Sequence, residues 1–343
     1  MVVRERVRHT YQRVRPWVPA LFFVGGFLWD ALTLGQRIKS VDLFILLGYL
    51  AGAAAILVAL GRGASFRGSQ YLNAVLQFFF GGIFSALFIF YFLSSSDLPG
   101  YLVVGAMAVL LVGNEFLESR YGELTLSWAF FTMSAAMFFN FALAHLFRSI
   151  STFWFYLGTL IAVGLVGMVK RLSKNEAASI VPSLGVAALL LVLHALNFIP
   201  PVPLVKKEML IAHDLQKRGG HYVALVESPA WRFWRSSSAT FHRQGEERVY
   251  CFTSVFVPNG IRTTIRHRWL VYDDSGDQWL ESGVVPFTIA GGREGGYRGY
   301  TYKQRVTTGL WRVVAESESG AAIGIIQFRV ERGQRSPMKR LRL

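Results

Sequence analysis

Arginine and tyrosine residues in the C-terminal part form the pattern that most strongly suggests binding chemistry. In IRTTIRHRWLVY (261–272) basic and apolar residues alternate, so a strand here would place Arg262, Arg266 and Arg268 on one face. The glycine-rich segment GGREGGYRGYTYK (291–303) contributes five more candidates, which are Arg293, Tyr297, Arg298, Tyr300 and Tyr302. Guanidinium groups bind phosphate or carboxylate through paired hydrogen bonds, and tyrosine rings can stack on sugar rings. We therefore expect these residues to bind an anionic lipid head group, a lipopolysaccharide phosphate or an acidic glycan, with a merely solvated strand face as the alternative.

A second set of polar residues interrupts the apolar runs of the first 200 residues. Ionisable side chains are costly within a membrane, so they are candidates for function. If the N-terminus is cytoplasmic, one cluster of polar residues is predicted to lie toward the periplasmic leaflet. The cluster consists of Asp30, Asn140, His145, His194 and Asn197, and Asp42 lies toward the same leaflet. Such a cluster could line the cavity of a transporter or lipid-handling protein, or relay protons in a membrane enzyme. The simpler explanation is that these residues lie at the membrane interface or form hydrogen bonds between helices.

Motifs for catalysis, metal binding and cofactor binding are absent from the sequence. It has no HExxH spacing, and GGREGG lacks the Gly-Lys-Ser/Thr ending of a phosphate-binding loop. The one cysteine, Cys251, excludes an internal disulfide and a CxxC redox pair. Strand alternation places His267 on the same face as Trp269, which predicts a hydrogen-bonded core histidine, and Cys251 is predicted to be a buried thiol. We therefore predict no cofactor and no metal, and no motif supports an enzymatic activity.

The composition is typical of a membrane protein. Hydrophobic residues make up 52% and charged residues 17% of the 343 residues, whereas an ordinary soluble domain has about 25% charged residues. The apolar runs before Pro200 are each near the ~20 residues that cross ~30 Å of hydrocarbon. Over 17–199 we predict seven spans, at 17–34, 41–60, 71–93, 98–117, 124–147, 152–169 and 180–199. Backbone groups in lipid must be paired within their own segment, so these spans are predicted to be helices.

The positions of the basic residues give the orientation of the predicted spans. The N-terminus (1–16) and the loops after the second, fourth and sixth spans carry eleven Lys and Arg, whereas the opposite loops carry three. Basic loops stay on the cytoplasmic side, so the N-terminus is predicted to be cytoplasmic and the C-terminal domain periplasmic. The net charge of +15 does not predict a nucleic-acid partner, because a high net charge alone is non-specific.

A connector and a β-domain are predicted after the last span. Prolines in FIPPVP (198–203) end the helix, and 200–220 is predicted to be a connector with a short helix over 205–220. From 221 to 331, short alternating segments separated by turns predict an all-β antiparallel sandwich, with the immunoglobulin-like form as the best match. Large aromatic residues are expected to anchor its core, namely Trp269, Trp311, Phe287 and Phe328. The basic end, 332–343, is predicted to be a disordered tail.

Three segments, IRHRWLVYDDSG, GGREGGYRGYTYK and GLWRVVAESESGAAIGIIQFRVE, resemble an uncharacterised bacterial domain of unknown function that often follows membrane spans. The resemblance covers about the last quarter of the chain. The seven-span part resembles, more loosely, the companion of that domain in an uncharacterised proteobacterial membrane family. The resemblance implies a bacterial inner-membrane protein with a periplasmic domain, and it implies no activity and no catalytic residues.

These observations together predict an integral inner-membrane protein that contacts the lipid bilayer through its spans. Its periplasmic sandwich is predicted to bind an envelope protein or an anionic glycolipid or glycan. The alternative is a transporter, a lipid-handling protein or a membrane enzyme that uses the intramembrane polar cluster.

Overall fold

The chain divides into two compact units. The computed structural model describes residues 18–33, 40–63, 71–201, 204–227, 239–256, 262–290 and 297–343. One unit, called here the helical unit, comprises 1–90, 104–142 and 155–192. The other, called the β unit, comprises 91–103, 143–154 and 193–343, so it contains every described strand together with several helix ends.

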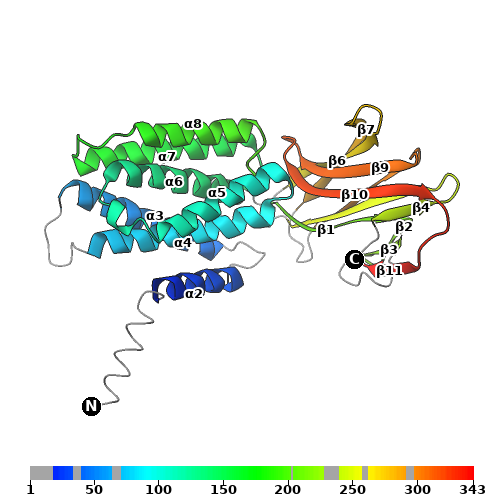
Figure 1. Cartoon of the computed structure of the whole chain (residues 1–343), viewed down its shortest axis with the longest axis horizontal. Helices are drawn as coiled ribbons and strands as arrows, with labels where there is room; N and C mark the ends of the chain where they lie inside the picture. Colours follow the sequence, from blue (N-terminus) through cyan, green and yellow to red (C-terminus); the bar gives the residue numbers. More distant parts are fainter. Residues whose placement is uncertain are drawn as a thin grey trace, which may run out of the picture. The chain divides into compact units, whose positions relative to one another are not determined.

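Seven α-helices lie between residues 18 and 195 of the described chain (Figure 1). They are α2 (Val18–Thr33), α3 (Ser40–Gly61), α4 (Leu72–Ser94), α5 (Leu98–Asn114), α6 (Leu124–Leu146), α7 (Thr152–Ser173) and α8 (Val181–Ala195), with a short 3-10 helix, η3 (Glu118–Arg120), before α6. Four of them, α3, α4, α6 and α7, are long and apolar enough to cross a membrane. Each helix falls within or close to one predicted span, and the crossing of the membrane by all seven stays a prediction.

Helix α8 shows how local backbone geometry shortens a predicted span. Asn197 adopts a left-handed backbone with φ of 58°, a conformation that asparagine tolerates better than most residues. The Phe198 N–H donates to the Leu193 carbonyl at 2.9 Å, which closes the helix end. The helix therefore stops at Ala195, although the apolar run continues to Ile199.

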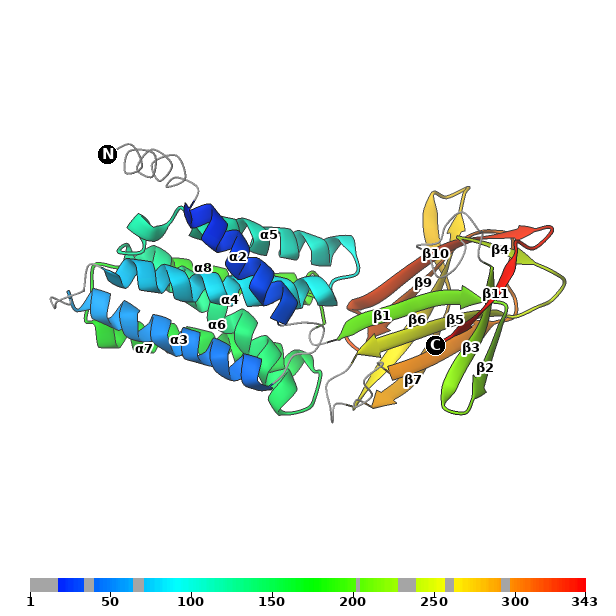
Figure 2. The ribbon, with the colours of Figure 1, turned by 90° about the horizontal axis from the view of Figure 1, so that it is seen from below.

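The β unit contains three sheets (Figure 2). The described strands are β1 (Val205–Ala212), β2 (Asp214–Arg218), β3 (His221–Glu227), β4 (Thr240–Arg243), β5 (Val249–Phe256), β6 (Arg262–Asp273), β7 (Gln278–Ala290), β8 (Tyr297–Lys303), β9 (Gly309–Ser317), β10 (Ala322–Arg332) and β11 (Met338–Arg342). The five-stranded sheet has the order β4-β10-β9-β6-β7, the central sheet β1-β5-β8, and the terminal sheet β11-β3-β2. The pairing of β4 with β10 is parallel and the other described pairings are antiparallel, so the architecture is mixed.

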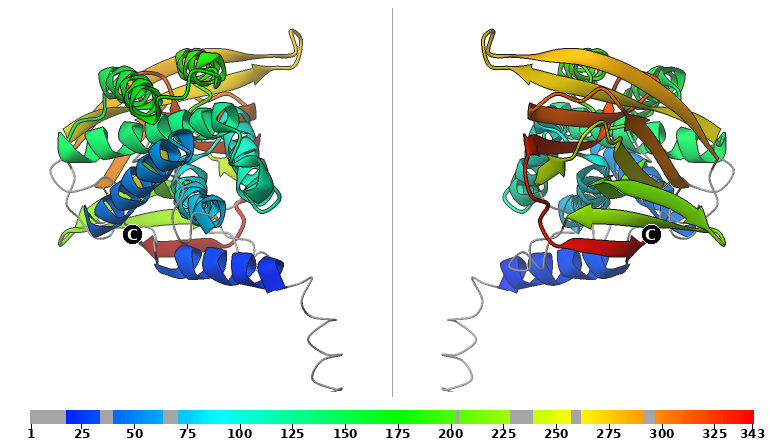
Figure 3. Two further views of the ribbon diagram at one scale, coloured as in Figure 1. Left: turned by 90° about the vertical axis from the view of Figure 1, so that its left-hand side faces the viewer. Right: turned by 90° about the vertical axis from the view of Figure 1, so that its right-hand side faces the viewer.

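The three sheets form layers, because the central sheet buries side chains on both of its faces (Figure 3). Toward the five-stranded sheet, Cys251 packs with Trp269 and Trp311. Toward the terminal sheet, Phe252 packs with Ala224 and Val226. The sequence predicted a two-layer sandwich, and the structure adds the terminal sheet as a third layer. The immunoglobulin-like form of the sandwich stays a prediction.

The predicted core anchors lie where expected. Trp269, Trp311 and Phe328 are each at most 2% exposed, and Phe287 is partly buried against a second core cluster. These rings fill the space between the five-stranded and central sheets, so the core forms without a disulfide.

Two local predictions are wrong. The short helix expected over 205–220 is instead strands β1 and β2. In β1, Ile211 faces the five-stranded sheet and Leu210 the terminal sheet, so burial on both faces removes the polar-apolar alternation that marks a strand. The basic tail predicted to be disordered contains β11, which pairs with β3 as an edge strand. Its exposed Lys and Arg residues are typical of a protected sheet edge.

Candidate functional site

Strand β8 presents tyrosines at an edge of the central sheet. Tyr300 lies opposite Phe252 of β5, and Tyr302 lies opposite Tyr250. Cross-strand partners point to the same side of a sheet, so these rings share the side that bears the terminal sheet. Tyr300 is 41% and Tyr302 49% exposed, so the rings remain open to a ligand at this edge.

Four tyrosines form one aromatic surface, called here the tyrosine face: Tyr222, Tyr250, Tyr300 and Tyr302. The Tyr300 ring lies 5.9 Å from that of Tyr222 and 6.3 Å from that of Tyr250. Tyr250 and Tyr302 are 5.7 Å apart. These are separations of favourable ring–ring contacts, so neighbouring rings limit the movement of each exposed phenol.

Cationic groups border the tyrosine face. The Arg248 guanidinium lies 4.7 Å from the centre of the Tyr302 ring, within the range of a cation–π contact. Strand alternation places Arg298 on the same side as Tyr300, opposite Ser254. Aromatic rings beside guanidinium groups can contact the apolar face of a sugar and an anionic substituent at the same time.

The alternate residues of β8 point into the core. Tyr297 packs against the core cluster that contains Ile265, so it does not belong to the tyrosine face. Gly299 lies against Phe287 of β7, and a Cβ there would be 2.3 Å from Phe287 Cε2. Gly299 therefore allows close packing of β8 against the five-stranded sheet.

His267 is a hydrogen-bonded core histidine, as predicted. Its Nε2 lies 2.8 Å from Thr253 Oγ1, and its Nδ1 lies 2.9 Å from Thr301 Oγ1. Trp269 Nε1 donates to the same Thr301 oxygen at 3.1 Å. Burial lowers the pKa of His267 to about 3, so the ring is neutral at pH 7. The buried Cys251 thiol also matches its prediction, and burial raises its pKa.

The arginines of β6 lie on a different surface from the tyrosine face. Arg266 and Arg268 are on the side of the five-stranded sheet opposite to His267, where both contact the buried Glu316 carboxylate at 3.2 and 2.9 Å. Glu316 thus offsets part of the positive charge that a ligand would meet there. The Arg262 side chain and Arg293 lie outside the described residues. The described surface residues of the predicted set are therefore divided between the five-stranded sheet (Arg266 and Arg268) and strand β8 (Arg298, Tyr300 and Tyr302), and ligand binding by either group stays a prediction.

A buried charged cluster around Glu227 was not predicted. Glu227 Oε1 accepts from the His242 N–H at 2.7 Å and lies 2.7 Å from His213 Nε2. Its Oε2 lies 2.6 Å from His242 Nδ1 and accepts from the Ser336 N–H at 3.2 Å. Glu247 Oε1 lies 3.4 Å from the other ring nitrogen of His213.

The Glu227 carboxylate is only 3% exposed. Burial alone would raise the pKa of Glu227, but the hydrogen bonds from His213, His242 and Ser336 outweigh burial and lower it to about 2. Glu227 therefore stays ionised and joins the terminal sheet to β4 and to the segment before β11. Among the described residues, no group of three or more His, Cys, Asp or Glu is placed to hold a metal ion.

The residues of the predicted intramembrane polar cluster are distributed between the two units. Asp30 and Asn140 belong to the helical unit, whereas His145, His194 and Asn197 belong to the β unit. Asp30 accepts a hydrogen bond of 2.6 Å from Ser85 of α4. A functional role for the predicted cluster as a whole stays a prediction.

Among the comparisons with known proteins, the match to a family identifies a domain in the C-terminal part of the chain. No curated protein matches the chain. One solved structure, "Pseudomonas fluorescens alkylpurine DNA glycosylase AlkC bound to DNA containing an abasic site analog", is 10% identical over 85% of this chain and 99% of that one. Its TM-score of 0.21 is too low to indicate a shared fold. The family described as "Protein of unknown function (DUF2914)" matches residues 262–330, so a domain of unknown function lies at the C-terminal end, from β6 into β10.

Proposed function

We propose that this chain is an integral inner-membrane protein that displays its β unit in the periplasm as a binding module for an anionic glycolipid or glycan. The observation that supports the proposal is the tyrosine face, where Tyr300 and Tyr302 remain exposed beside Arg248. The four apolar helices support a membrane location. The periplasmic side rests on the eleven-to-three distribution of basic residues.

The chemistry of the tyrosine face favours a sugar ligand over a purely lipidic one. Exposed phenol rings offer flat apolar surfaces together with hydroxyl groups, a combination that suits the alternating apolar and polar surface of a sugar ring. The Arg248 guanidinium can donate to a phosphate or carboxylate on that sugar while its plane remains on Tyr302. An envelope protein with an acidic surface is the second partner class that this site would accept.

Removing the two exposed rings is expected to abolish most of the binding. The double variant Tyr300→Ala/Tyr302→Ala, made in the full-length protein in detergent, should bind lipopolysaccharide about tenfold more weakly, since each lost aromatic contact contributes about 0.5–1.5 kcal/mol. Surface plasmon resonance measures the affinity. Tyr272→Ala is the matched control, because Tyr272 lies on the five-stranded sheet beside Trp279. Equal affinities of the double variant and the wild-type protein would contradict glycolipid binding by the tyrosine face.

The proposed orientation is tested by reporter fusions. Alkaline phosphatase fused after Leu343 is expected to be active, since this enzyme matures only in the periplasm, and green fluorescent protein at the same position should stay dark when exported through the same route. An inactive alkaline phosphatase fusion together with a fluorescent green fluorescent protein fusion would place the β unit in the cytoplasm. That result would overturn the periplasmic function.

A further inference from the structure

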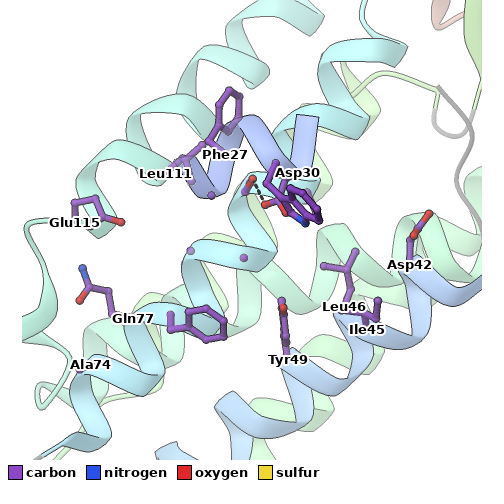
Figure 4. A pocket seen from close by; sticks show the side chains of 17 residues that line it. Phe27, Asp30, Asp42, Ile45, Leu46, Tyr49, Ala74, Gln77, Leu111 and Glu115 are labelled. Atoms are coloured by element: carbon purple, nitrogen blue, oxygen red, sulfur yellow. Dashed lines mark hydrogen bonds between the residues drawn. The ribbon is translucent and has the colours of Figure 1, made fainter. Parts of the chain in front are cut away.

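The helical unit contains a cavity of about 840 Å³ that the proposed function does not use. Helices α2, α3, α4 and α5 line it (Figure 4). On α4 its lining runs from Ala74 to Ala86, a distance of about 18 Å at 1.5 Å per helical residue. The cavity is therefore elongated and extends over more than half of the ~30 Å of a bilayer's hydrocarbon.

The wall of the cavity is apolar except for a few oxygen-bearing groups. Phe27, Leu46 and Phe78 contribute hydrocarbon surface, and Tyr49 adds an aromatic ring. Figure 4 shows Glu115 toward one end, and Asp30 and Asp42 toward the other. Among the described lining residues none is Lys, Arg or His, so any charge that the lining side chains carry is negative.

The polar groups are held in place by contacts between helices. Ser85 of α4 donates to Asp30 Oδ2 of α2 at 2.6 Å. Gln77 Nε2 donates to the Asn114 carbonyl at 3.1 Å, and Asn114 Nδ2 donates back to the Gln77 carbonyl at 3.2 Å. The reciprocal pair fixes α4 against the end of α5, which places Glu115 at the cavity wall.

Glycines keep the cavity open. A Cβ at Gly82 would lie 2.6 Å from the Tyr49 ring, so only glycine lets that ring lie against α4. Gly26 also lines the cavity, and a Cβ there would meet no atom within 4 Å. The space beside Gly26 can therefore hold part of a ligand or a larger side chain.

We propose that this cavity is a binding site for an amphiphilic organic cation, which is a molecule with an apolar body and a fixed positive charge. Burial of the body against the aromatic and aliphatic wall supplies hydrophobic free energy. The charge is attracted to Asp30 and to Glu115, and attraction between opposite charges is stronger in an apolar environment than in water. A neutral acyl chain would gain only the hydrophobic part, and a hydrophobic anion would be repelled.

Two probes of equal size and shape and opposite charge test the proposal. The full-length protein is placed in phosphatidylcholine nanodiscs, and binding of tetraphenylphosphonium and of tetraphenylborate is measured by equilibrium dialysis, with empty nanodiscs subtracted. We expect saturable binding of tetraphenylphosphonium at about one molecule per chain and no saturable binding of tetraphenylborate. Equal binding of both probes, or no saturable binding of the cation, would overturn the proposal.

Variants assign the binding to the cavity. Asp30→Asn is expected to weaken tetraphenylphosphonium binding at least tenfold, whereas Glu176→Gln, in an exposed loop, should leave it unchanged. Gly26→Leu leaves every carboxylate in place and fills part of the cavity, so it should also weaken binding at least tenfold. Gly105→Leu is its control, because Gly105 has the same open surroundings on α5 and does not line the cavity.

The two kinds of variant keep the test decisive if one of them misfolds. Circular dichroism and elution of the nanodisc as a single species show whether each variant retains its helices. Wild-type affinity in a folded Asp30→Asn or a folded Gly26→Leu variant would place the cation elsewhere and contradict the assignment to this cavity. Binding of lipopolysaccharide by the tyrosine face is expected to be unaffected in both variants, so the two proposals fail independently.

Discussion

Replacing Glu227 with alanine is expected to lower the free energy of unfolding of the β unit by about 3–5 kcal/mol, because several donors lose their buried acceptor and each such loss costs about 1–3 kcal/mol. The carboxylate is 3% exposed and lies within 2.7 Å of ring nitrogens of both His213 and His242. Its loss leaves these groups buried without their acceptor, and it also removes the acceptor of the Ser336 N–H before β11. The terminal sheet should therefore separate first.

Hydrogen exchange of the full-length protein in detergent measures this effect strand by strand. In Glu227→Ala, exchange should accelerate most in β3, β4 and β11, which meet at the cluster. Glu246→Ala is the matched control, since Glu246 is an exposed carboxylate next to Glu247 in the same loop. Unchanged protection of β3 and β11 in Glu227→Ala would show that the cluster does not hold the terminal sheet.

The pH dependence of this contribution follows from the lowered pKa. Glu227 titrates near 2 in the folded protein and at an ordinary 4.5 when unfolded. Its stabilising effect is therefore fully present above pH 4.5 and is lost as the pH falls from 4.5 toward 2. The difference in stability between the wild-type protein and Glu227→Ala should shrink over that interval.

The helical elements could be predicted from the sequence because each is a long apolar run. Seven runs predicted seven helices, and the structure differs mainly at their ends, where single residues such as Asn197 terminate a helix. Hydropathy does not contain that information, because it averages over a window and a helix end depends on one backbone conformation. Among the described helices, α3, α4, α6 and α7 are long and apolar enough to cross a membrane, whereas α2, α5 and α8 are shorter.

Strand β6 was predictable from its sequence, whereas β1 and β11 were missed for two different physical reasons. Strand β6 alternates clearly, so its inward Trp269 and its outward arginines were assigned correctly. Strand β1 lies in the middle of three layers and lacks such alternation. Strand β11 is basic because its charged side chains are exposed at a sheet edge, a composition that a disordered tail shares.

Two of the four residues of the tyrosine face could be predicted from the sequence, whereas the Glu227 cluster could not. Tyr300 and Tyr302 are two residues apart on one strand, so their common direction follows from alternation. Tyr250 joins them through the pairing of β5 with β8, and Tyr222 through the packing of the terminal sheet on the central sheet. The sequence contains one local signal for the Glu227 cluster, because the apolar strand HYVALVE ends in a carboxylate. Its histidine partners lie 14 and 15 positions away, so no spacing motif connects them.

Acidification from pH 7 to pH 4.5 is expected to cost the β unit about 2–3 kcal/mol through His267 alone. The ring is fully buried and its pKa is lowered to about 3, whereas an unfolded histidine titrates near 6.5. Below pH 6.5 the unfolded chain therefore binds a proton that the folded chain does not, so stability falls with pH until about 3. One pKa unit corresponds to about 1.4 kcal/mol, which gives the stated loss over about two units.

His267→Gln is the variant that isolates this effect, because a glutamine amide can still hydrogen-bond Thr253 and Thr301 but does not titrate. Urea unfolding of the full-length protein in detergent, followed by tryptophan fluorescence, should show the wild-type protein losing about 2–3 kcal/mol more than His267→Gln between pH 7 and 4.5. His221→Gln, at an exposed position of β3, should behave like the wild-type protein. Parallel curves for the wild-type protein and His267→Gln would mean that the core histidine is protonated in the folded state. In that case the Thr253–His267–Thr301 chain would have to accommodate a cation, because both ring nitrogens would then be donors to hydroxyl oxygens.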